Sequence, residues 1–477
     1  MKLTNKILTG IIIGIITLSS CSKVLDVEPQ QSVDAANAIQ TADDVDQLVI
    51  GTYALMGQGQ LYGTNLFLLP DLLAGNPGID ADSADRYITW QGTFQGQRQV
   101  FQKTMTRDNS ESQRTWVEAY QAINNANLVL ANLDKVSDPD QRSQLEGEAL
   151  LARGVLHFEL VRLFALPWDA QPDNSQPGVV IQTTATRLAE EASQTKARST
   201  VAQVYAAVIA DITTAIGKLP ETNGNRFDQF TAQAFLARVY LQQSNFAGAR
   251  DAANAVIESG NYALNASVAA VFSNRNTAES IFEIQQNDQN NAGQTNDGMA
   301  TFYASIPGIG RGDVRVPDNF QLLYPAGDLR ASELFYQGRS NRPGTYSGKW
   351  RSFTQNLPVI RIAEMYLIRA ETNLRLGTQV GDSPANDLAQ IRNPARTNTT
   401  APSAPTLQDI LDERLLELAY EGHRIHDIKR LQLDPAVIIG SPDSPEPLPW
   451  NSDLLVMPIP VREIDASRGT IIQNPGY

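Results

Sequence analysis

The densest group of side chains able to do chemistry lies between positions 413 and 430, in the sequence ERLLELAYEGHRIHDIKR. Its members could act as acids and bases or hold a metal ion: Glu417, Glu421, His423, Arg424, His426, Asp427 and Arg430. The two histidines are three positions apart, unlike the HExxH spacing of zinc enzymes, and no third ligand is apparent. Acids and arginines three or four positions apart on a helix pair with each other. We therefore predict a buried polar network in a helical scaffold and no catalytic centre.

Two isolated signals could indicate a histidine ligand or a calcium site. His157 stands among apolar neighbours, which is typical of a hydrogen-bonded histidine in a protein core. The acidic run Asp80, Asp82 and Asp85 could hold a calcium ion, but it lacks the glycine and the terminal glutamate of an EF-hand loop. A solvated acidic loop is the preferred interpretation, and a structural calcium ion is the alternative. We predict no other metal and no cofactor.

Aromatic side chains in two polar regions could bind a carbohydrate, because sugar C–H groups stack on flat rings while the hydroxyls need donors and acceptors. The first set lies within residues 57–110 and consists of Arg86, Tyr87, Trp90 and Phe94, with Asn76 and Asp82 nearby. The second set lies within residues 285–355 and consists of Tyr346, Lys349, Trp350 and Arg351, with Tyr303 and Asn287 as weaker members. Simple packing of the two regions is the alternative role for Trp90 and Trp350.

Composition limits the classes of function. The chain has 477 residues, 38 basic and 52 acidic side chains, a net charge of −14, three histidines and one cysteine. An acidic chain argues against a nucleic-acid partner, which needs a clustered basic surface. One cysteine cannot form an internal disulfide or a multi-cysteine metal site. Hydrophobic residues make up 42%, which is enough for a large packed core.

The single cysteine follows a segment that looks like a secretion signal. Lys2 and Lys6 precede the apolar run Ile7–Leu18, which is too short to span a bilayer but suits a signal peptide. The next residues, Ser19-Ser20-Cys21, resemble a bacterial lipobox, in which the signal is cut before the cysteine and the cysteine takes a lipid. We expect residues 1–20 to be this signal, Cys21 to be the lipidated residue and residues 21–40 to be a tether. An ordinary signal with a chance cysteine is the alternative.

The remaining pattern predicts a mainly α-helical single domain over residues 41–477. Apolar residues recur every three or four positions in the following segments: 43–56, Gln113–Val136, Gln141–Phe164, Val201–Leu219, Thr231–Gln243, Phe246–Ser259, Ile362–Leu376, Ala385–Ile391 and Leu407–Arg430. These segments form pairs of about 34 residues, typical of tetratricopeptide-like helix hairpins. Residues 57–110 and 285–355 lack the period and are expected to be long irregular insertions, which usually carry function.

Several segments together resemble one family, SusD/RagB, the surface nutrient-binding lipoproteins of Bacteroidetes. The resembling segments occur in the family's order along the whole chain: 146–164 (EGEALLARGVLHFELVRLF), 361–371 (RIAEMYLIRAE), 413–430, 458–465 (PIPVREID) and 473–477 (QNPGY). Glu146 departs from the family pattern, which has arginine there. Leu166 departs too, where Gly-Asp-Val-Pro is common.

The resemblance implies a bundle of four tetratricopeptide-like hairpins with irregular insertions that form the ligand face. It also implies a lipid anchor in the outer membrane at the cell surface and a SusC-type TonB-dependent transporter as partner. The implied ligand is an oligosaccharide or polysaccharide, contacted from the two insertions by residues that vary between members, and no catalysis is implied. The alternatives are a peptide-binding member, a glycoside hydrolase with paired carboxylates, or a scaffold that binds only proteins.

Overall fold

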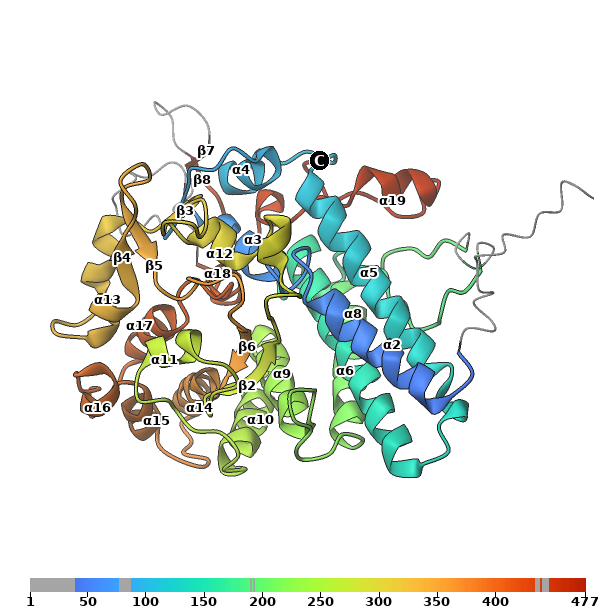
Figure 1. The fold of residues 1–477 in the computed structure, drawn as a ribbon, viewed down its shortest axis with the longest axis horizontal. Coiled ribbons are helices and arrows are strands. Elements are labelled where there is room, and N and C mark those ends of the chain that lie inside the picture. The colour runs from blue at the N-terminus through green and yellow to red at the C-terminus, as the bar shows by residue number, and fades with distance from the viewer. Residues whose placement is uncertain (1–38, 77–86, 189–190, 192–193, 434–437, 440–445) are drawn as a thin grey trace, which may run out of the picture. The chain divides into compact units, whose positions relative to one another are not determined.

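The computed structural model describes residues 39–76, 87–188, 191, 194–433, 438–439 and 446–477 (Figure 1). Cys21, most of the expected tether, Arg86 and the acidic run 80–85 lie outside these residues. Residues Thr41–Tyr477 form one folded unit. Within the described part, no helix is both long and apolar enough to cross a membrane.

A series of long helices forms the scaffold, in which each helix packs on the next (Figure 1). The series runs α2 (Ala42–Met56), α5 (Ser110–Leu130), α6 (Pro139–Phe164), α8 (Val201–Ile216), α9 (Gln229–Gln242), α10 (Phe246–Glu258) and α14 (Ile362–Leu376), and α14 also packs on α15 (Pro384–Ile391) and α17 (Leu407–Glu417). The predicted mainly α-helical, tetratricopeptide-like fold class is confirmed. The predicted bounds of these helices agree within a few residues, except at the C-terminal end of α5 and in 407–430.

Local signals explain where the scaffold helices begin and why they approach closely. Asp138 accepts hydrogen bonds from two N–H groups of the first turn of α6, and Pro139 occupies that turn without losing a needed donor. Thr200 and Gln203 form a capping box at the start of α8. A Cβ on Gly147 of α6 would come within 2.8 Å of Leu219 Cγ. The small residue therefore lets α6 lie against the end of the α8 segment.

The two insertions contain regular structure, which the sequence analysis did not expect. The first contains α3 (Asn65–Ala74), β1 (Thr89–Trp90) and α4 (Gln95–Gln102). Every residue of α3 is buried, so its sequence has no polar face and no helical period to detect. The second contains the short elements η4 (Ala292–Thr295), α12 (Met299–Tyr303), β3 (Val314–Arg315), η5 (Asp318–Leu323), α13 (Leu329–Glu333), β4 (Phe335–Gln337) and β5 (Thr345–Ser347).

The insertions are joined to each other and to the scaffold. β1 pairs with β3 in antiparallel register, Trp90 opposite Val314, and β4 pairs with β5. One hydrophobic core cluster includes residues of the scaffold helices and of both insertions.

The remaining elements are η2 (Leu133–Lys135), η3 (Pro172–Asn174), α11 (Val268–Ser273), β2 (Ser280–Ile284) paired with β6 (Leu357–Arg361), α16 (Pro394–Thr397), α18 (Arg424–Arg430), β7 (Ile438–Ile439) paired with β8 (Glu446–Pro447), η6 (Asp453–Leu455) and α19 (Val461–Ala466).

The segment expected as one helix, Leu407–Arg430, is two. α17 ends at Glu417 and α18 begins at Arg424. Between them, Tyr420 and Gly422 have φ of 64° and 77°, in the left-handed region that an α-helix cannot include. The prediction of one continuous helix is therefore wrong. Its acids and bases consequently lie on two helices and a tight turn.

Candidate functional site

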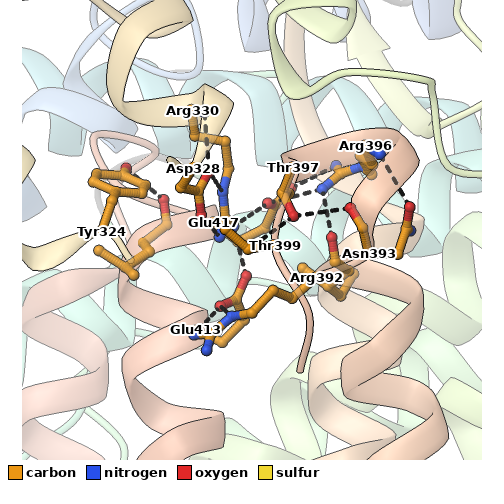
Figure 2. Close-up of polar contacts among 12 residues, drawn as sticks. Tyr324, Asp328, Arg330, Arg392, Asn393, Arg396, Thr397, Thr399, Glu413 and Glu417 are labelled. Carbon is orange, nitrogen blue, oxygen red and sulfur yellow. Dashed lines mark hydrogen bonds and ion pairs between the residues drawn. The ribbon is translucent and has the colours of Figure 1, made fainter. Parts of the chain in front are cut away.

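The charged C-terminal segment builds a buried ion network (Figure 2). Arg330 lies among Asp328, Glu413 and Glu417, with its Nη1 3.0 Å from Glu417 Oε2, and Arg396 Nη2 lies 2.8 Å from Glu417 Oε1. The network matches acids with equal numbers of bases: Asp328, Glu279, Glu413, Glu417 and Glu421 against Arg330, Lys349, Arg361, Arg392 and Arg396. The predicted buried polar network is confirmed.

The electrostatics of Glu417 show how firmly this network is paired. Burial alone would raise the pKa of the Glu417 carboxyl, but Arg396, Arg361 and Arg330 hold it well below its usual range. A carboxylate that stays ionised against three guanidinium groups is a poor proton donor or acceptor for a substrate. The network therefore supports the scaffold.

His157 is a buried and hydrogen-bonded part of the scaffold. His157 is 2% exposed, its Nδ1 lies 2.9 Å from Arg153 O, and its Nε2 accepts the N–H of Gln182. Burial lowers the pKa of His157 to about 4, so it is a neutral core histidine, as predicted. Among the residues that the structure describes, no group of three His, Cys, Asp or Glu could hold a metal ion.

Most of the sequence-predicted ligand residues that the structure describes are enclosed. Trp350, Tyr346 and Tyr303 are 0% exposed, and Tyr87 and Trp90 are 4% and 7% exposed. None of these rings presents an open face to solvent, because the insertions fold around their own aromatic side chains. The geometry corresponds to packing of the insertions, the alternative role considered for Trp90 and Trp350.

Individual contacts confirm how tightly these rings are held. Trp350 Nε1 donates to Tyr420 O at 2.9 Å, and Tyr303 Oη donates to the buried carboxylate of Asp71. Gln91 Nε2 donates to Tyr346 Oη at 2.8 Å. These hydrogen bonds fix the rings as parts of the core.

The two predicted amide residues lie in different surroundings. Asn76 is buried, 3% exposed. Asn287 is exposed, and its Oδ1 accepts the N–H groups of Gln289 and Asn290 in a local turn. Of these two residues, one is therefore enclosed and the other takes part in a local turn.

A pocket does form where the two insertions meet, and we call it the insertion pocket. Its volume is about 300 Å³. The first insertion, the second insertion and the first turns of α5 all line it, through Gln58, Gln60, Phe94, Gln97, Glu111, Arg114, Thr295, Asn296 and Asp297. The predicted regions therefore share one cavity, although most of its lining residues were not predicted.

The pocket wall carries a compact charged group. Arg114 Nη1 lies 3.1 Å from Glu111 Oε2, and Nη2 forms a close ion pair with Asp297. Burial raises the pKa of Asp297, and the Arg114 guanidinium opposes that rise. Two carboxylates against one guanidinium leave the wall with net negative charge, rich in hydrogen-bond acceptors.

Gln97 lines the pocket with a buried side chain. Gln97 is 2% exposed and its Oε1 makes no hydrogen bond to any residue that the structure describes. Buried polar atoms are almost always hydrogen-bonded, so an orphaned acceptor in a cavity wall suits a ligand hydroxyl. The Gln97 oxygen is itself enclosed, so a ligand hydroxyl would reach it only after the side chain turns toward the pocket.

Phe94 provides the aromatic surface of the pocket. It is 39% exposed, in contrast to the buried rings. The Arg311 guanidinium lies 4.1 Å from its ring centroid, and Phe302 makes an edge contact at 6.2 Å. The sequence analysis named Phe94 in the first aromatic set. It did not find the charged residues of the pocket, because Glu111 with Arg114, Asp297 and Arg311 lie in three separate segments that share no sequence motif.

A larger groove of about 640 Å³ lies elsewhere, between α5, residues 180–186, 191 and 194–196, and α19. None of its described lining residues belongs to either insertion. Trp116 at its wall is 2% exposed, and the Tyr120 hydroxyl donates to Val180 O. The groove is the alternative location for a ligand.

A scaffold of helical hairpins with a pocket between long insertions defines a class of binding proteins, and similarity to known proteins names the family. A family model described as "Starch-binding associating with outer membrane" matches residues 23–241, and a model described as "SusD family" matches residues 334–477. The chain belongs to the SusD/RagB family.

Similar proteins match over nearly their whole length. The SusD-like protein P2 of Formosa agariphila is 28% identical, with 98% of each chain covered. A SusD superfamily protein from Bacteroides thetaiotaomicron is 26% identical with a TM-score of 0.78, covering 91% of this chain and all of that structure. A SusD superfamily protein from Bacteroides vulgatus is 25% identical with a TM-score of 0.77, covering 92% of this chain and all of that structure.

Proposed function

We propose that this protein binds an oligosaccharide or polysaccharide at the cell surface and delivers it to a SusC-type TonB-dependent transporter. The observation that carries the proposal is the insertion pocket, which combines a partly exposed ring, Phe94, with a charged wall of Glu111, Arg114 and Asp297. Rings beside convergent polar groups are typical of carbohydrate sites. The family description, which names starch binding and the outer membrane, supports this choice of ligand and location.

We also propose that lipidated Cys21 anchors the protein in the outer membrane. Several acyl chains on one residue hold a protein on a bilayer firmly. Metabolic labelling with a fatty acid, followed by fractionation, tests this proposal. Cys21→Ala should abolish both the label and the membrane fraction, and a labelled, membrane-bound variant would contradict the anchor.

Binding of the mature protein to a glycan panel, measured by calorimetry, tests the ligand proposal. Phe94→Ala should weaken binding by about five- to thirtyfold, since one stacked ring contributes about 1–2 kcal/mol. The matched control is Phe246→Ala, because Phe246 is also partly exposed beneath an arginine, Arg375, at 4.9 Å, but lies on α10 outside the pocket. Glu463→Ala tests the larger groove.

Each outcome separates one alternative. Loss of binding only in Glu463→Ala would move the site to the groove. Binding of peptides but of no glycan would make this a peptide-binding member. Release of reducing ends from a bound glycan would indicate a glycoside hydrolase. Co-purification with a transporter without any small ligand would indicate a scaffold that binds only proteins.

A further inference from the structure

A small cavity lies where the C-terminal turn of α6 meets α18, and we call it the α6–α18 cavity. Its volume is about 20 Å³, and it is separate from the insertion pocket. Polar groups from four helices face it, namely Arg162, Tyr205, Gln242, His426 and Lys429. A space of this size accommodates one guest of about the size of a water molecule.

Lys429 is the unusual member of this group. Its side chain is 3% exposed, and in the described part of the chain its one hydrogen bond is a long contact of 3.4 Å to Arg162 O. No carboxylate of the described residues lies within ion-pair distance of its Nζ. An ammonium group that is buried without a counter-charge is strongly unfavourable.

Two further polar atoms of the lining residues lack partners. Arg162 Nε and His426 Nε2 are buried and make no hydrogen bond to any described residue. His426 is 3% exposed, and burial, followed by the nearby Arg162 and Lys429, holds its pKa well below its usual range. A neutral imidazole carries one N–H, so its Nε2 can donate into the cavity.

The neighbouring acids are already engaged. Glu159 pairs with Arg162 and also accepts the Tyr62 hydroxyl. Glu371 and Asp427 pair with Arg430 on the same helix as Lys429. The charge of Lys429 therefore has no counter-ion among the described residues. Burial and the Arg162 charge accordingly lower the pKa of Lys429 to about 7.

We propose that the α6–α18 cavity binds one small inorganic anion of the size of chloride. The Lys429 ammonium supplies the charge, and Arg162 Nε and His426 Nε2 supply N–H donors that otherwise remain unsatisfied. The small volume favours a halide over sulfate, phosphate or a sugar. A bound water would only satisfy the donors, whereas an anion would also favour the ammonium form of Lys429, which burial disfavours.

The anion would connect two segments that are far apart in the sequence. Arg162 lies near the C-terminal end of the segment 146–164, and Lys429 lies in the segment 413–430. Binding only to the folded state stabilises it by mass action. The protein should therefore show a specific and saturable dependence of stability on halide, beyond the general effect of ionic strength.

Unfolding of the full mature chain in chloride, against gluconate at the same ionic strength, tests the proposal. If the dissociation constant is about 10 mM, raising chloride from about 1 to about 100 mM shifts the folding equilibrium about tenfold. Bromide should act like chloride. Lys429→Met should remove the dependence. Lys218→Met should keep it, because the Lys218 side chain is 37% exposed and pairs with Glu146 at the surface.

Diffraction from crystals of the unaltered protein keeps the proposal testable if Lys429→Met fails to fold. After exchange of chloride for bromide at moderate concentration, an anomalous peak should lie within hydrogen-bond distance of Lys429 Nζ and Arg162 Nε. Equal stability in chloride and gluconate would overturn the proposal, and so would a cavity without an anomalous peak. The insertion pocket and its ligand play no part in either measurement, so the outcome is independent of the proposed function.

Discussion

The backbone N–H of Tyr420 donates to the phenolic oxygen of Tyr87 over 2.7 Å, and the two rings stack with centroids 5.2 Å apart. Next to this contact, the N–H of Gly422 donates to Asp71 Oδ1 at 3.2 Å. Tyr87 and Asp71 belong to the first insertion, whereas Tyr420 and Gly422 form the turn between α17 and α18. The left-handed turn of the C-terminal segment is therefore held by side chains of the insertion.

Tyr87→Phe should destabilise the protein by about 1–3 kcal/mol, because it leaves the buried Tyr420 N–H without an acceptor. Urea denaturation of both proteins measures this difference. Tyr240→Phe is the matched control, since no described residue hydrogen-bonds to the Tyr240 hydroxyl. Equal losses in the two variants would show that the turn does not depend on Tyr87.

Glu417→Gln should destabilise the protein by about 3–5 kcal/mol, because Arg330, Arg361 and Arg396 then share one carboxylate fewer in a buried network. Thermal and urea unfolding near neutral pH measure the loss, and complete loss of folded protein agrees with it. Glu221→Gln, at an exposed acid, should change stability by less than about 0.5 kcal/mol. A change below about 1 kcal/mol in Glu417→Gln would contradict a supporting role for the network.

The sequence predicts the scaffold well because most of its helices bury one side against their neighbours. α14 was expected at Ile362–Leu376 and has those bounds. The helical spacing of apolar residues does not predict the structure where a segment is buried on all sides, as in α3. It also does not do so where contacts with distant residues impose a local conformation. Tyr420 illustrates the second case, since its positive φ depends on Tyr87, which local sequence does not reveal.

The candidate site was predictable only as a region. An aromatic residue in a polar insertion is compatible with a ligand face or with the packing of that insertion, and composition cannot separate the two. Trp350 became core, whereas Phe94 remained partly exposed. The charged wall could not be found, because Asp297 meets Glu111 and Arg114 of α5 only when the second insertion closes on that helix.

Lys103→Met should destabilise the protein by about 1–3 kcal/mol. Lys103 Nζ donates to Leu72 O at 2.9 Å, Gly75 O at 2.7 Å and Phe101 O at 3.1 Å, so the variant removes three hydrogen bonds at the ends of α3 and α4. Leu72 O keeps the N–H of Gly75 as a donor. Urea denaturation measures the loss, and Lys135→Met, at a surface lysine beside Asp134, is the control. A gain in stability would show that relief of the buried charge outweighs the lost hydrogen bonds.

Asp71 should make stability fall as pH rises through the weakly acidic range. Asp71 is fully buried, and burial raises the pKa of its carboxyl to about 7, against the opposing hydrogen bonds from Tyr303, Gly422 and Tyr87. The unfolded chain releases this proton near the ordinary pKa of 3.8, so between about pH 4 and 7 the folded state binds more protons. The contribution of Asp71 to the free energy of unfolding therefore decreases as pH rises from about 4 to 7, and it is constant at higher pH.

Asp71→Asn isolates this effect, because the amide resembles the protonated carboxyl and does not titrate. Relative to the unaltered protein, the variant should gain up to about 1.4 kcal/mol for each pH unit between about pH 4 and 7. Carboxyls with a lowered pKa, such as Glu417, make both proteins less stable toward low pH. This effect is the same in the two proteins and cancels in the difference between their free energies of unfolding. Urea unfolding at about pH 5, 6 and 8 measures the difference in free energy of unfolding between the variant and the unaltered protein. Asp108→Asn, at an exposed residue, is the control. A difference that does not vary with pH would show that Asp71 is ionised in the folded protein throughout this range.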